Sequence, residues 1–469
     1  MEEIKYYPHD ECGVFGIYNH PEAANLTYLG LYALQHRGQE SAGIAVKGKA
    51  PEIKCHKDLG LVNEVFSEST LRSLEGHIAI GHVRYSTTGS NYVLNAQPIV
   101  VNYKDGYLAA AHNGNLVNAY KLRLELENRG AIFQSSTDTE VIIHLIAHSL
   151  QGDFLNVLEE VGTVIKGAFS LIFIKDNKLY AMKDPNGFRP LCVGKLPNGG
   201  YAVSSESCAF DIINCKYLFS LEPGEIVWFD EDGIHRHRYS KKVNHSLCIF
   251  EYIYYSRPDS IIFGHNVYSI RKALGIQLAK EHPVEADIVI PVPDSSIPAA
   301  IGYSQELGIP FELGMIRNHY VGRTFIEPKQ QIRDFGAKIK YNPVSDAIRG
   351  KRVIVIDDSI VRGTTSKKIV KMLKKAGAKE IHLRISCPPW KYPCYFGIDT
   401  PEASKLIANK MSVEEIAKYL KINSLAYLSI EGLLSVVPDA ENKYCKACFD
   451  NNYPVKPYYF KKEIMEFKK

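Results

Sequence analysis

The chain has 469 residues, enough for two to three domains, and its 45% hydrophobic and 23% charged residues are typical of a soluble globular protein. A net charge of +4, from 56 basic and 52 acidic residues, is too balanced to favour nucleic acid as a partner. No stretch approaches the roughly 18 apolar residues of a membrane span, and the acidic start lacks a signal-peptide pattern, so we expect a cytoplasmic protein without membrane contact.

The first half of the chain predicts a layered domain of strands and helices. Turn residues separate short apolar runs there, a pattern typical of strands. The expected strands cover residues 12–18, 41–48, 77–86, 106–115, 168–176, 178–184, 200–207 and 225–233. Apolar residues recur at helical spacing in Tyr28–Gln35 and Asp138–Leu150, so we expect helices packed on sheets rather than a pure sandwich.

Cys12 begins a series of five short segments in this first domain. It lies in ECGVFGIY, and a lone cysteine is most often a buried structural residue. Four segments follow in order: LQHRGQESAGI at 34–44, GHVRYST at 81–87, AHNGN at 111–115 and SSTDTE at 135–140. Together they resemble the glutaminase domain of the N-terminal-nucleophile amidotransferases. The resemblance implies an αββα fold, removal of residues 1–11 as a propeptide, and Cys12 as the first residue of the mature chain.

The resemblance implies a reaction that needs no separate histidine base. A free α-amino group has a pKa near ~8 and can activate the thiol of its own residue. The Cys12 thiolate then attacks the glutamine carboxamide, which gives a thioester and ammonia. By resemblance, Asn113 and Gly114 hold the oxyanion, Arg84 and Asp138 bind the two charged ends of glutamine, and Arg37 and Gly38 shape the pocket. Taken singly, Arg84 also suits a surface ion pair, and Asn113 with Gly114 suits a hairpin turn.

The second half of the chain changes to strands that alternate with helices, as in a parallel sheet. We place the domain boundary in the polar stretch 238–244, which gives domains at 12–240 and 241–430 and a tail at 431–469. Ala286–Pro293 and Val353–Ile356 predict buried strands that end in small polar or acidic residues. Because ligands bind beyond the carboxyl ends of strands in such sheets, these two ends are expected to form one site.

The run VIVIDDSIVRGTT, from Val353 to Thr365, is the most specific motif of the chain. Its aspartates could simply cap the helix that follows. Acid pair, spacing and ending together resemble the phosphoribosyl pyrophosphate (PRPP) loop of the type I phosphoribosyltransferases, which implies a parallel-sheet α/β domain. By resemblance, Ser295, Asp357 and Asp358 hold one Mg²⁺, an ion that prefers oxygen ligands. The implied PRPP contacts are Asp357, Asp358, Ser359, Arg362, Gly363, Thr364, Thr365, Arg323 and Lys340.

Two of these contacts lie outside the motif. Arg323 belongs to the segment 317–333, which is rich in cations and has little periodicity, and by resemblance this segment orders over PRPP as a gate. Lys340 is a further phosphate-binding candidate, although an ordinary surface lysine would also explain it.

Ten cysteines in a chain expected to be intracellular are not expected to form disulfides. Cys445 and Cys448 form a CxxC pair, which alone suits a redox pair, half a zinc site or a chance spacing. The resemblance adds Cys248 and Cys394, the ligands of a structural [4Fe-4S] cluster in one branch of the glutamine PRPP amidotransferases. Four thiolates also suit Zn²⁺, so their chemistry leaves the metal open.

Taken whole, the chain resembles the glutamine PRPP amidotransferases. The resemblance implies that PRPP, glutamine and water give 5-phosphoribosylamine, glutamate and pyrophosphate, the first step of purine synthesis. It also implies an apolar ammonia passage between domains, purine nucleotide feedback inhibitors and a homotetramer. Two alternatives are a glutamine-dependent amidotransferase with a sugar-isomerase domain, which the PRPP motif argues against, and a catalytically silent sensor of PRPP or nucleotides, which would not need the glutaminase residues.

Overall fold

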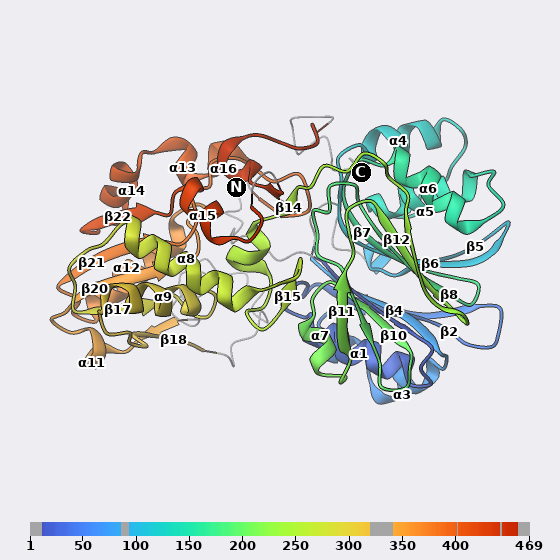
Figure 1. Cartoon of the computed structure of the whole chain (residues 1–469), viewed down its shortest axis with the longest axis horizontal. Coiled ribbons are helices and arrows are strands. Elements are labelled where there is room, and N and C mark those ends of the chain that lie inside the picture. The colour runs from blue at the N-terminus through green and yellow to red at the C-terminus, as the bar shows by residue number, and fades with distance from the viewer. Residues whose placement is uncertain (1–11, 86–92, 319–340, 401, 441–442, 458–469) are drawn as a thin grey trace.

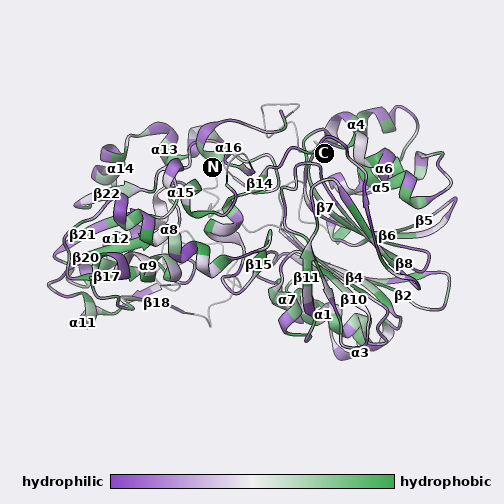
Figure 2. Ribbon diagram, in the orientation of Figure 1, coloured by the Kyte–Doolittle hydropathy of each residue, from purple (hydrophilic) through white to green (hydrophobic). Residues whose placement is uncertain are grey.

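The computed structural model describes residues 12–85, 93–318, 341–400, 402–440 and 443–457. The chain forms two lobes, one from the first half of the sequence and one from the second (Figure 1). Among the described residues, no helix combines the length and the hydrophobicity that crossing a bilayer would require. Hydrophilic residues are prominent on the outer helices of both lobes (Figure 2).

The first lobe contains two antiparallel sheets. The seven-stranded sheet has the order β11-β9-β10-β1-β4-β2-β3. Its strands are β1 (Gly13–Tyr18), β2 (Ser41–Lys47), β3 (Ile53–Leu59), β4 (Ile78–Arg84), β9 (Cys192–Lys195), β10 (Tyr201–Ser204) and β11 (Lys216–Ser220). The six-stranded sheet has the order β13-β12-β8-β7-β6-β5. Its strands are β5 (Ile99–Tyr103), β6 (Gly106–Leu116), β7 (Gly167–Lys175), β8 (Lys178–Lys183), β12 (Glu225–Asp230) and β13 (Gly233–Arg238).

Helices cover the outer face of each sheet. On the seven-stranded sheet lie α1 (Ala23–Ala33), α2 (Val62–Val65), α3 (Glu68–Ser73) and α7 (Cys208–Asp211), and on the other lie α4 (Ala119–Glu127), α5 (Asp138–His148) and α6 (Phe154–Val164). Between the sheets, Val14 and Ile80 from one side pack with Ile172 and Val227 from the other. The lobe therefore has four layers, and the predicted αββα fold is confirmed.

The second lobe contains a parallel sheet with the order β17-β20-β21-β22. Its strands are β17 (Ile288–Pro291), β20 (Arg352–Asp357), β21 (Glu380–Ile385) and β22 (Ser424–Tyr427). The helices around it are α8 (Val267–Glu281), α9 (Ile297–Leu307), α12 (Thr364–Lys375), α14 (Val413–Leu420) and α15 (Ile430–Val436). One hydrophobic core joins the sheet to these helices. The predicted parallel α/β domain is confirmed.

Short elements complete the described chain. They are η1 (Val93–Asn95), β14 (Leu247–Cys248), η2 (Glu251–Tyr255), β15 (Ile261–Ile262), β16 (His265–Asn266), β18 (Met315–Arg317), β19 (Tyr341–Pro343), α11 (Ser345–Ile348), η3 (Ala403–Lys405), α13 (Ile407–Lys410), β23 (Tyr444–Cys445) and α16 (Ala447–Asp450). In β14 and β23, Cys248 and Cys445 are parallel partners, so the described tail joins the start of the second lobe.

Each strand predicted in the first half of the chain is present, but five others are missing from the prediction. These are β3, β5, β9, β11 and β13. In β3, the sequence IKCHKDL buries only its isoleucine fully, and β13 has the polar sequence GIHRHR. Both are edge strands, where exposed polar side chains weaken the apolar signal that a sequence offers.

Candidate active sites in the two lobes

Cys12 lies directly before β1, a central strand of the seven-stranded sheet. It is 9% exposed, and its Sγ lies 3.6 Å from the carbonyl oxygen of Tyr85. The Nε of Arg37 donates to the carbonyl oxygen of Cys12 at 3.3 Å. The structure thus brings Arg37 against the predicted nucleophile.

Gly38 packs directly on the end of β4. A Cβ at this position would lie 2.6 Å from the Arg84 nitrogen, so a side chain here would displace the backbone of β4. Arg84 itself is only 3% exposed, and the alternative of a surface ion pair is therefore wrong. Arg37, Gly38 and Arg84 form one wall next to Cys12.

Asn113 and Gly114 lie within β6, paired with Ser170 and Phe169 of β7. The alternative of a hairpin turn is wrong, because both residues continue the strand. Gly114 has φ +151°, and a Cβ there would lie 2.1 Å from the Ala168 carbonyl oxygen, so only glycine fits.

Ser205 connects this strand to the nucleophile. Its Oγ accepts from the Val14 nitrogen at 3.0 Å, two residues after Cys12, and it lies 3.4 Å from Asn113 Nδ2. Ser205 thereby places the Asn113 side chain close to the backbone that follows Cys12.

Asp138 is the first residue of α5, and its carboxylate faces β6. Its Oδ2 accepts from the Leu116 nitrogen at 2.9 Å, and its Oδ1 lies 3.5 Å from His112 Nδ1. Burial alone would raise the pKa of Asp138, but His112 and the hydrogen bonds lower it below its usual value. Asp138 is therefore ionised at neutral pH, as binding of an ammonium group requires.

In the second lobe, β17 and β20 are parallel neighbours, with Pro291 opposite Ile356. The segments after them consequently leave the sheet at the same edge. The Oγ of Ser295 donates to Asp358 Oδ2 at 2.5 Å, and the Oγ of Ser359 donates to Asp358 Oδ1 at 2.7 Å. The structure thus joins Ser295 to the acid pair, 63 residues away in sequence.

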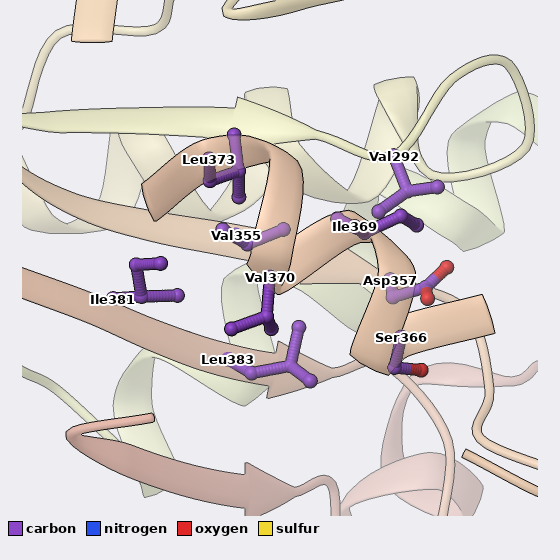
Figure 3. Close-up of a pocket in the computed structure, with 9 residues that line it drawn as sticks. All are labelled: Val292, Val355, Asp357, Ser366, Ile369, Val370, Leu373, Ile381 and Leu383. Atoms are coloured by element: carbon purple, nitrogen blue, oxygen red, sulfur yellow. The ribbon is translucent and has the colours of Figure 1, made fainter. Parts of the chain in front are cut away.

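The acid pair is deeply buried, with Asp357 8% and Asp358 6% exposed. Burial, and then the charge of Asp358, raise the pKa of Asp357 well above its usual value. Burial also raises the pKa of Asp358, although Ser295 and Ser359 offset part of the rise. In Figure 3, Asp357 and Ser366 lie at one end of a group of apolar side chains that α12 and the neighbouring strands contribute. Two buried oxygen ligands that repel each other suit a divalent cation.

The N-terminus of α12 follows the acid pair. Its N-cap is Gly363, with φ +74°, so the alternative in which the aspartates cap this helix is wrong. Thr364 and Thr365 form the first turn, and Arg362 is half-buried beside them. Backbone amides at such an end favour phosphate groups. Arg323 and Lys340 lie outside the described residues.

The four predicted cluster cysteines gather where the lobes meet. Cys248 and Cys445 are strand partners, and Cys448 follows in α16. Burial, and then the charges of Cys445, Cys248 and Cys394, raise the pKa of Cys448 well above its usual value. The Cys448 carbonyl accepts from the nitrogens of Lys391 and Tyr392, both at 3.0 Å. Within the described ranges, no three His, Cys, Asp or Glu side chains form a group that could hold a metal ion.

Three charged residues near Cys12 were not predicted from the sequence. Glu206, Glu251 and Arg189 are fully buried and form an ionic network with Arg37. Glu251 lies 214 residues from Arg37 in sequence, and no local spacing relates them. A buried charge paired with a distant partner leaves no periodic signal to detect.

Comparison with known proteins identifies the family. A glutamine amidotransferase domain model matches residues 82–211, and a phosphoribosyl transferase domain model matches residues 264–397. The amidophosphoribosyltransferase of Bacillus subtilis (strain 168) is 48% identical over 463 residues, which cover 98% of this chain and 97% of the relative. This chain belongs to the amidophosphoribosyltransferase family. The Archaeoglobus fulgidus relative is 49% identical, covering 95% of this chain and 98% of its own length. Amidophosphoribosyltransferase 2, chloroplastic, of Arabidopsis thaliana is 51% identical over 96% of this chain and 80% of its own.

Solved structures of amidophosphoribosyltransferases agree in fold. The B. subtilis glutamine PRPP amidotransferase complexed with ADP and GMP has a TM-score of 0.90 and 48% identity, covering 95% of this chain and 98% of its own. A structure described as the allosteric regulatory enzyme of purine biosynthesis has a TM-score of 0.91 and 48% identity, covering 95% and 97%. The predicted family is confirmed, and the alternative with a sugar-isomerase domain is wrong.

Proposed function

We propose that this chain is an amidophosphoribosyltransferase that converts PRPP, glutamine and water to 5-phosphoribosylamine, glutamate and pyrophosphate, the first step of purine biosynthesis. One observation carries the proposal. Cys12 with its buried Arg37 and Arg84 lies in one lobe, and the Asp357–Asp358 pair lies at a strand end of the other. A single chain therefore offers both an ammonia-releasing site and a site for an activated sugar phosphate.

In the first lobe, removal of residues 1–11 would free the α-amino group of Cys12 as its own base. Arg84 would bind the α-carboxylate of glutamine and Asp138 its α-ammonium, so each end of the substrate meets an opposite charge. Asn113 and Gly114 would donate to the oxyanion of the tetrahedral intermediate, where losing one donor typically costs about 3 to 4 kcal/mol. Support comes from the rigid placement of Gly114 in β6 and from the burial of Arg84.

In the second lobe, Asp357, Asp358 and Ser295 would hold Mg²⁺. The fit is chemical, since two buried carboxylates and a hydroxyl supply hard oxygen ligands, and the charge of Asp358 raises the pKa of Asp357 further beyond the effect of burial. When bound, the ion would offset charge on the departing pyrophosphate. The PRPP contacts would come from Ser359 and from the loop and first turn of α12, namely Arg362, Gly363, Thr364 and Thr365. Arg323 and Lys340 complete the proposed PRPP contacts.

Cys248, Cys394, Cys445 and Cys448 would hold a [4Fe-4S] cluster. Support comes from the pairing of Cys248 with Cys445, although no three of the described thiols form a metal-binding group in this structure. A four-iron cluster matches four thiolates because each iron binds one of them. Zn²⁺ is the second candidate, since a tetrahedral Cys₄ site takes the same donors. Either group would fasten the described tail, 443–457, to the Lys391–Cys394 loop.

The remaining parts of the proposal concern assembly and regulation. We expect purine nucleotides as feedback inhibitors, a homotetramer, a cytoplasmic location and an apolar ammonia passage between the lobes. The B. subtilis relative complexed with ADP and GMP supports nucleotide binding. Chloroplast relatives show that the location varies among homologues. The domain limits 12–240, 241–430 and 431–469 stay predictions.

The decisive experiment measures product formation and maturation together. Purified enzyme is given PRPP, Mg²⁺ and either glutamine or ammonia, and phosphoribosylamine and pyrophosphate are quantified. The same protein is analysed by N-terminal sequencing and for iron, sulfide and zinc. We expect product from both nitrogen sources, Cys12 as the first residue, and about four irons and four sulfides per chain. Correctly matured protein that consumes neither PRPP nor glutamine would refute the function.

A further inference from the structure

A buried asparagine of the first lobe joins two segments beside the proposed glutamine site. Asn95 is the last residue of η1 and is only 2% exposed. Its Oδ1 accepts from the Ser136 nitrogen at 3.0 Å, and its Nδ2 donates to Ser136 Oγ at 3.0 Å. The two residues are 41 positions apart in sequence. Asn95 therefore fastens the segment 134–137, which leads into Asp138 and α5, to the segment 93–98.

The backbone around Asn95 is itself held by both sheets. Lys57 of β3, in the seven-stranded sheet, donates through its Nζ to the carbonyl oxygen of Ala96 at 2.6 Å. The Oε1 of Gln97 accepts from the backbone nitrogen of His112 in β6, in the six-stranded sheet, at 2.7 Å. Because each sheet fixes one neighbour of Asn95, its side chain is a firm support for the segment that it binds.

A carboxylate of α5 binds the segment on its other side. Glu140 is 8% exposed, and its Oε1 accepts from the Gln134 nitrogen at 2.8 Å. Its Oε2 accepts from the Ser135 nitrogen at 2.7 Å and from Ser135 Oγ at 2.6 Å. These bonds join the segment to its own helix, so that the two form one unit. Asn95 then fixes this unit to the backbone around η1.

The two carboxylate oxygens of Asp138 differ in how firmly they are bound. Its Oδ2 accepts from the Leu116 nitrogen at 2.9 Å. Its Oδ1 has longer contacts, 3.4 Å to Thr137 Oγ1 and 3.5 Å to His112 Nδ1. Oδ1 is therefore the oxygen that can better accept a hydrogen bond from an ammonium group. Its direction depends on the backbone at the start of α5, which Asn95 positions.

We propose that Asn95 is a positioning residue for recognition of the α-ammonium group of glutamine, and that it contributes to the preference for an α-amino amide as substrate. It acts through Asp138 and does not touch the substrate. The inference rests on the proposed function, which assigns the ammonium group to Asp138. A misplacement of about 1 Å can cost about 10²-fold. Loss of Asn95 should therefore weaken glutamine binding and leave the chemistry at Cys12 in place.

The test uses full-length, matured enzyme with the substitution Asn95→Ala and two amides. One is glutamine, and the other is glutaramate, which differs from glutamine only in lacking the α-amino group. We expect KM for glutamine to rise at least about tenfold, with kcat within about threefold. The kcat/KM for glutaramate should change less than about twofold, so the preference for glutamine should fall about fivefold or more. Formation of phosphoribosylamine from PRPP and ammonia should stay within about twofold.

Two further variants calibrate the measurement. Asp138→Asn should lower the preference for glutamine at least as much as Asn95→Ala does, because it removes the proposed partner of the ammonium group. Asn198→Ala is the control and should leave the preference unchanged. Asn198 also binds through both amide atoms, since its Nδ2 donates to the Asn19 carbonyl oxygen and its Oδ1 accepts from the Gly200 nitrogen. It lies near the end of β1 that is opposite to Cys12.

An unchanged preference in Asn95→Ala, or equal losses with both amides, would mean a general structural role and would overturn the inference. If Asn95→Ala does not fold, Ser136→Ala decides the matter. That variant loses the hydroxyl contact and keeps the backbone contact with Asn95, so its preference should fall about threefold, and an unchanged preference would count against the proposal. If Asp138→Asn also leaves the preference unchanged, the proposed role of Asp138 is wrong and the inference falls with it. A wild type that hydrolyses no glutamine would instead refute the proposed function.

Discussion

Two pairs of buried carboxylates, one near each proposed active centre, differ in how their charge is met. Glu206 and Glu251 face Arg37 and Arg189, and their pKa values lie below the usual range despite burial. Asp357 and Asp358 face each other, and their pKa values are raised. The charges of the first pair are neutralised by the two arginines, so this pair can fix the positions of the arginine side chains. In the second pair, like charges lie side by side, which suits the proposed site for a cation and a phosphorylated ligand.

The largest expected effect comes from a substitution that should abolish the reaction at one centre and leave the other active. Cys12→Ala removes the proposed nucleophile, so phosphoribosylamine formation from glutamine should fall by at least about 10⁴-fold. Formation from ammonia should remain, because the acid pair is untouched. Assays with each nitrogen source check this, with Cys55→Ala as the control cysteine of the same lobe. Loss of both reactions in Cys12→Ala would mean that the centres are not separable.

Loss of one carboxylate of the second pair should impair the reactions with both nitrogen sources, whereas loss of Cys12 should impair only the reaction with glutamine. Asp357→Asn is expected to lower the glutamine- and ammonia-dependent reactions together by about 10² to 10³-fold, since the proposed function requires Mg²⁺ and PRPP at this strand end for both. Titration of activity with Mg²⁺ should show a higher requirement. Asp287→Asn, an exposed carboxylate before β17, serves as the control. Retained ammonia-dependent activity with Asp357→Asn would show that the acid pair is not part of the PRPP site.

The sequence predicted the acid pair and the Cys12 motifs because each is a contiguous segment. The strand that ends at Asp357 is a continuous β-branched run, and Cys12 precedes an apolar strand that pairs on both sides. The network around Glu251 was not predictable in the same way. Its members come from η2 and from the segments after α1, β8 and β10, and only the folded chain joins them.

Local sequence was also misleading at two places that the structure corrects. Asn113 and Gly114 have the composition of a hairpin turn, but pairing with β7 on one side keeps them in a long strand. Arginine is usually a surface residue, but Arg84 ends a strand whose seven residues are all buried. In both cases tertiary packing overrides a preference that two or three residues express.

Neutralising one carboxylate of each pair should change the stability of the folded protein in opposite directions. In enzyme treated with chelator, Asp357→Asn should raise the melting temperature by a few degrees, because it removes repulsion between buried like charges. Glu251→Gln should destabilise the protein by about 3 to 5 kcal/mol, because it leaves arginine charge uncompensated. Calorimetry on the same preparations measures both. Destabilisation by Asp357→Asn without metal would show that its charge is already balanced.

The pH dependence sharpens the same contrast. The pKa of Asp357 is raised in the folded state, so folding favours its protonated form. The resulting loss of stability is present at neutral pH and disappears as pH falls toward about 4, the unfolded value. The advantage of Asp357→Asn should therefore shrink as pH falls. Glu251 has a pKa lowered to about 2, so the defect of Glu251→Gln should stay constant down to about pH 5 and diminish only below about 4. Melting curves of the three proteins in chelator, at intervals from pH 8 to 3, test both trends.

Ser295→Ala should give the smallest effect, and it examines how the acid pair is held rather than its charge. The hydroxyl donates to Asp358 at 2.5 Å, and a hydrogen bond to a charged group contributes about 1.5 to 3 kcal/mol. Its loss should raise the pKa of Asp358 further and increase the Mg²⁺ concentration for half-maximal ammonia-dependent activity roughly tenfold, with little change in glutamine hydrolysis without PRPP. Ser269→Ala, an exposed serine in α8, is the control. If Ser295→Ala leaves the Mg²⁺ requirement unchanged, Ser295 only buttresses Asp358, and the ion would be held by the two carboxylates.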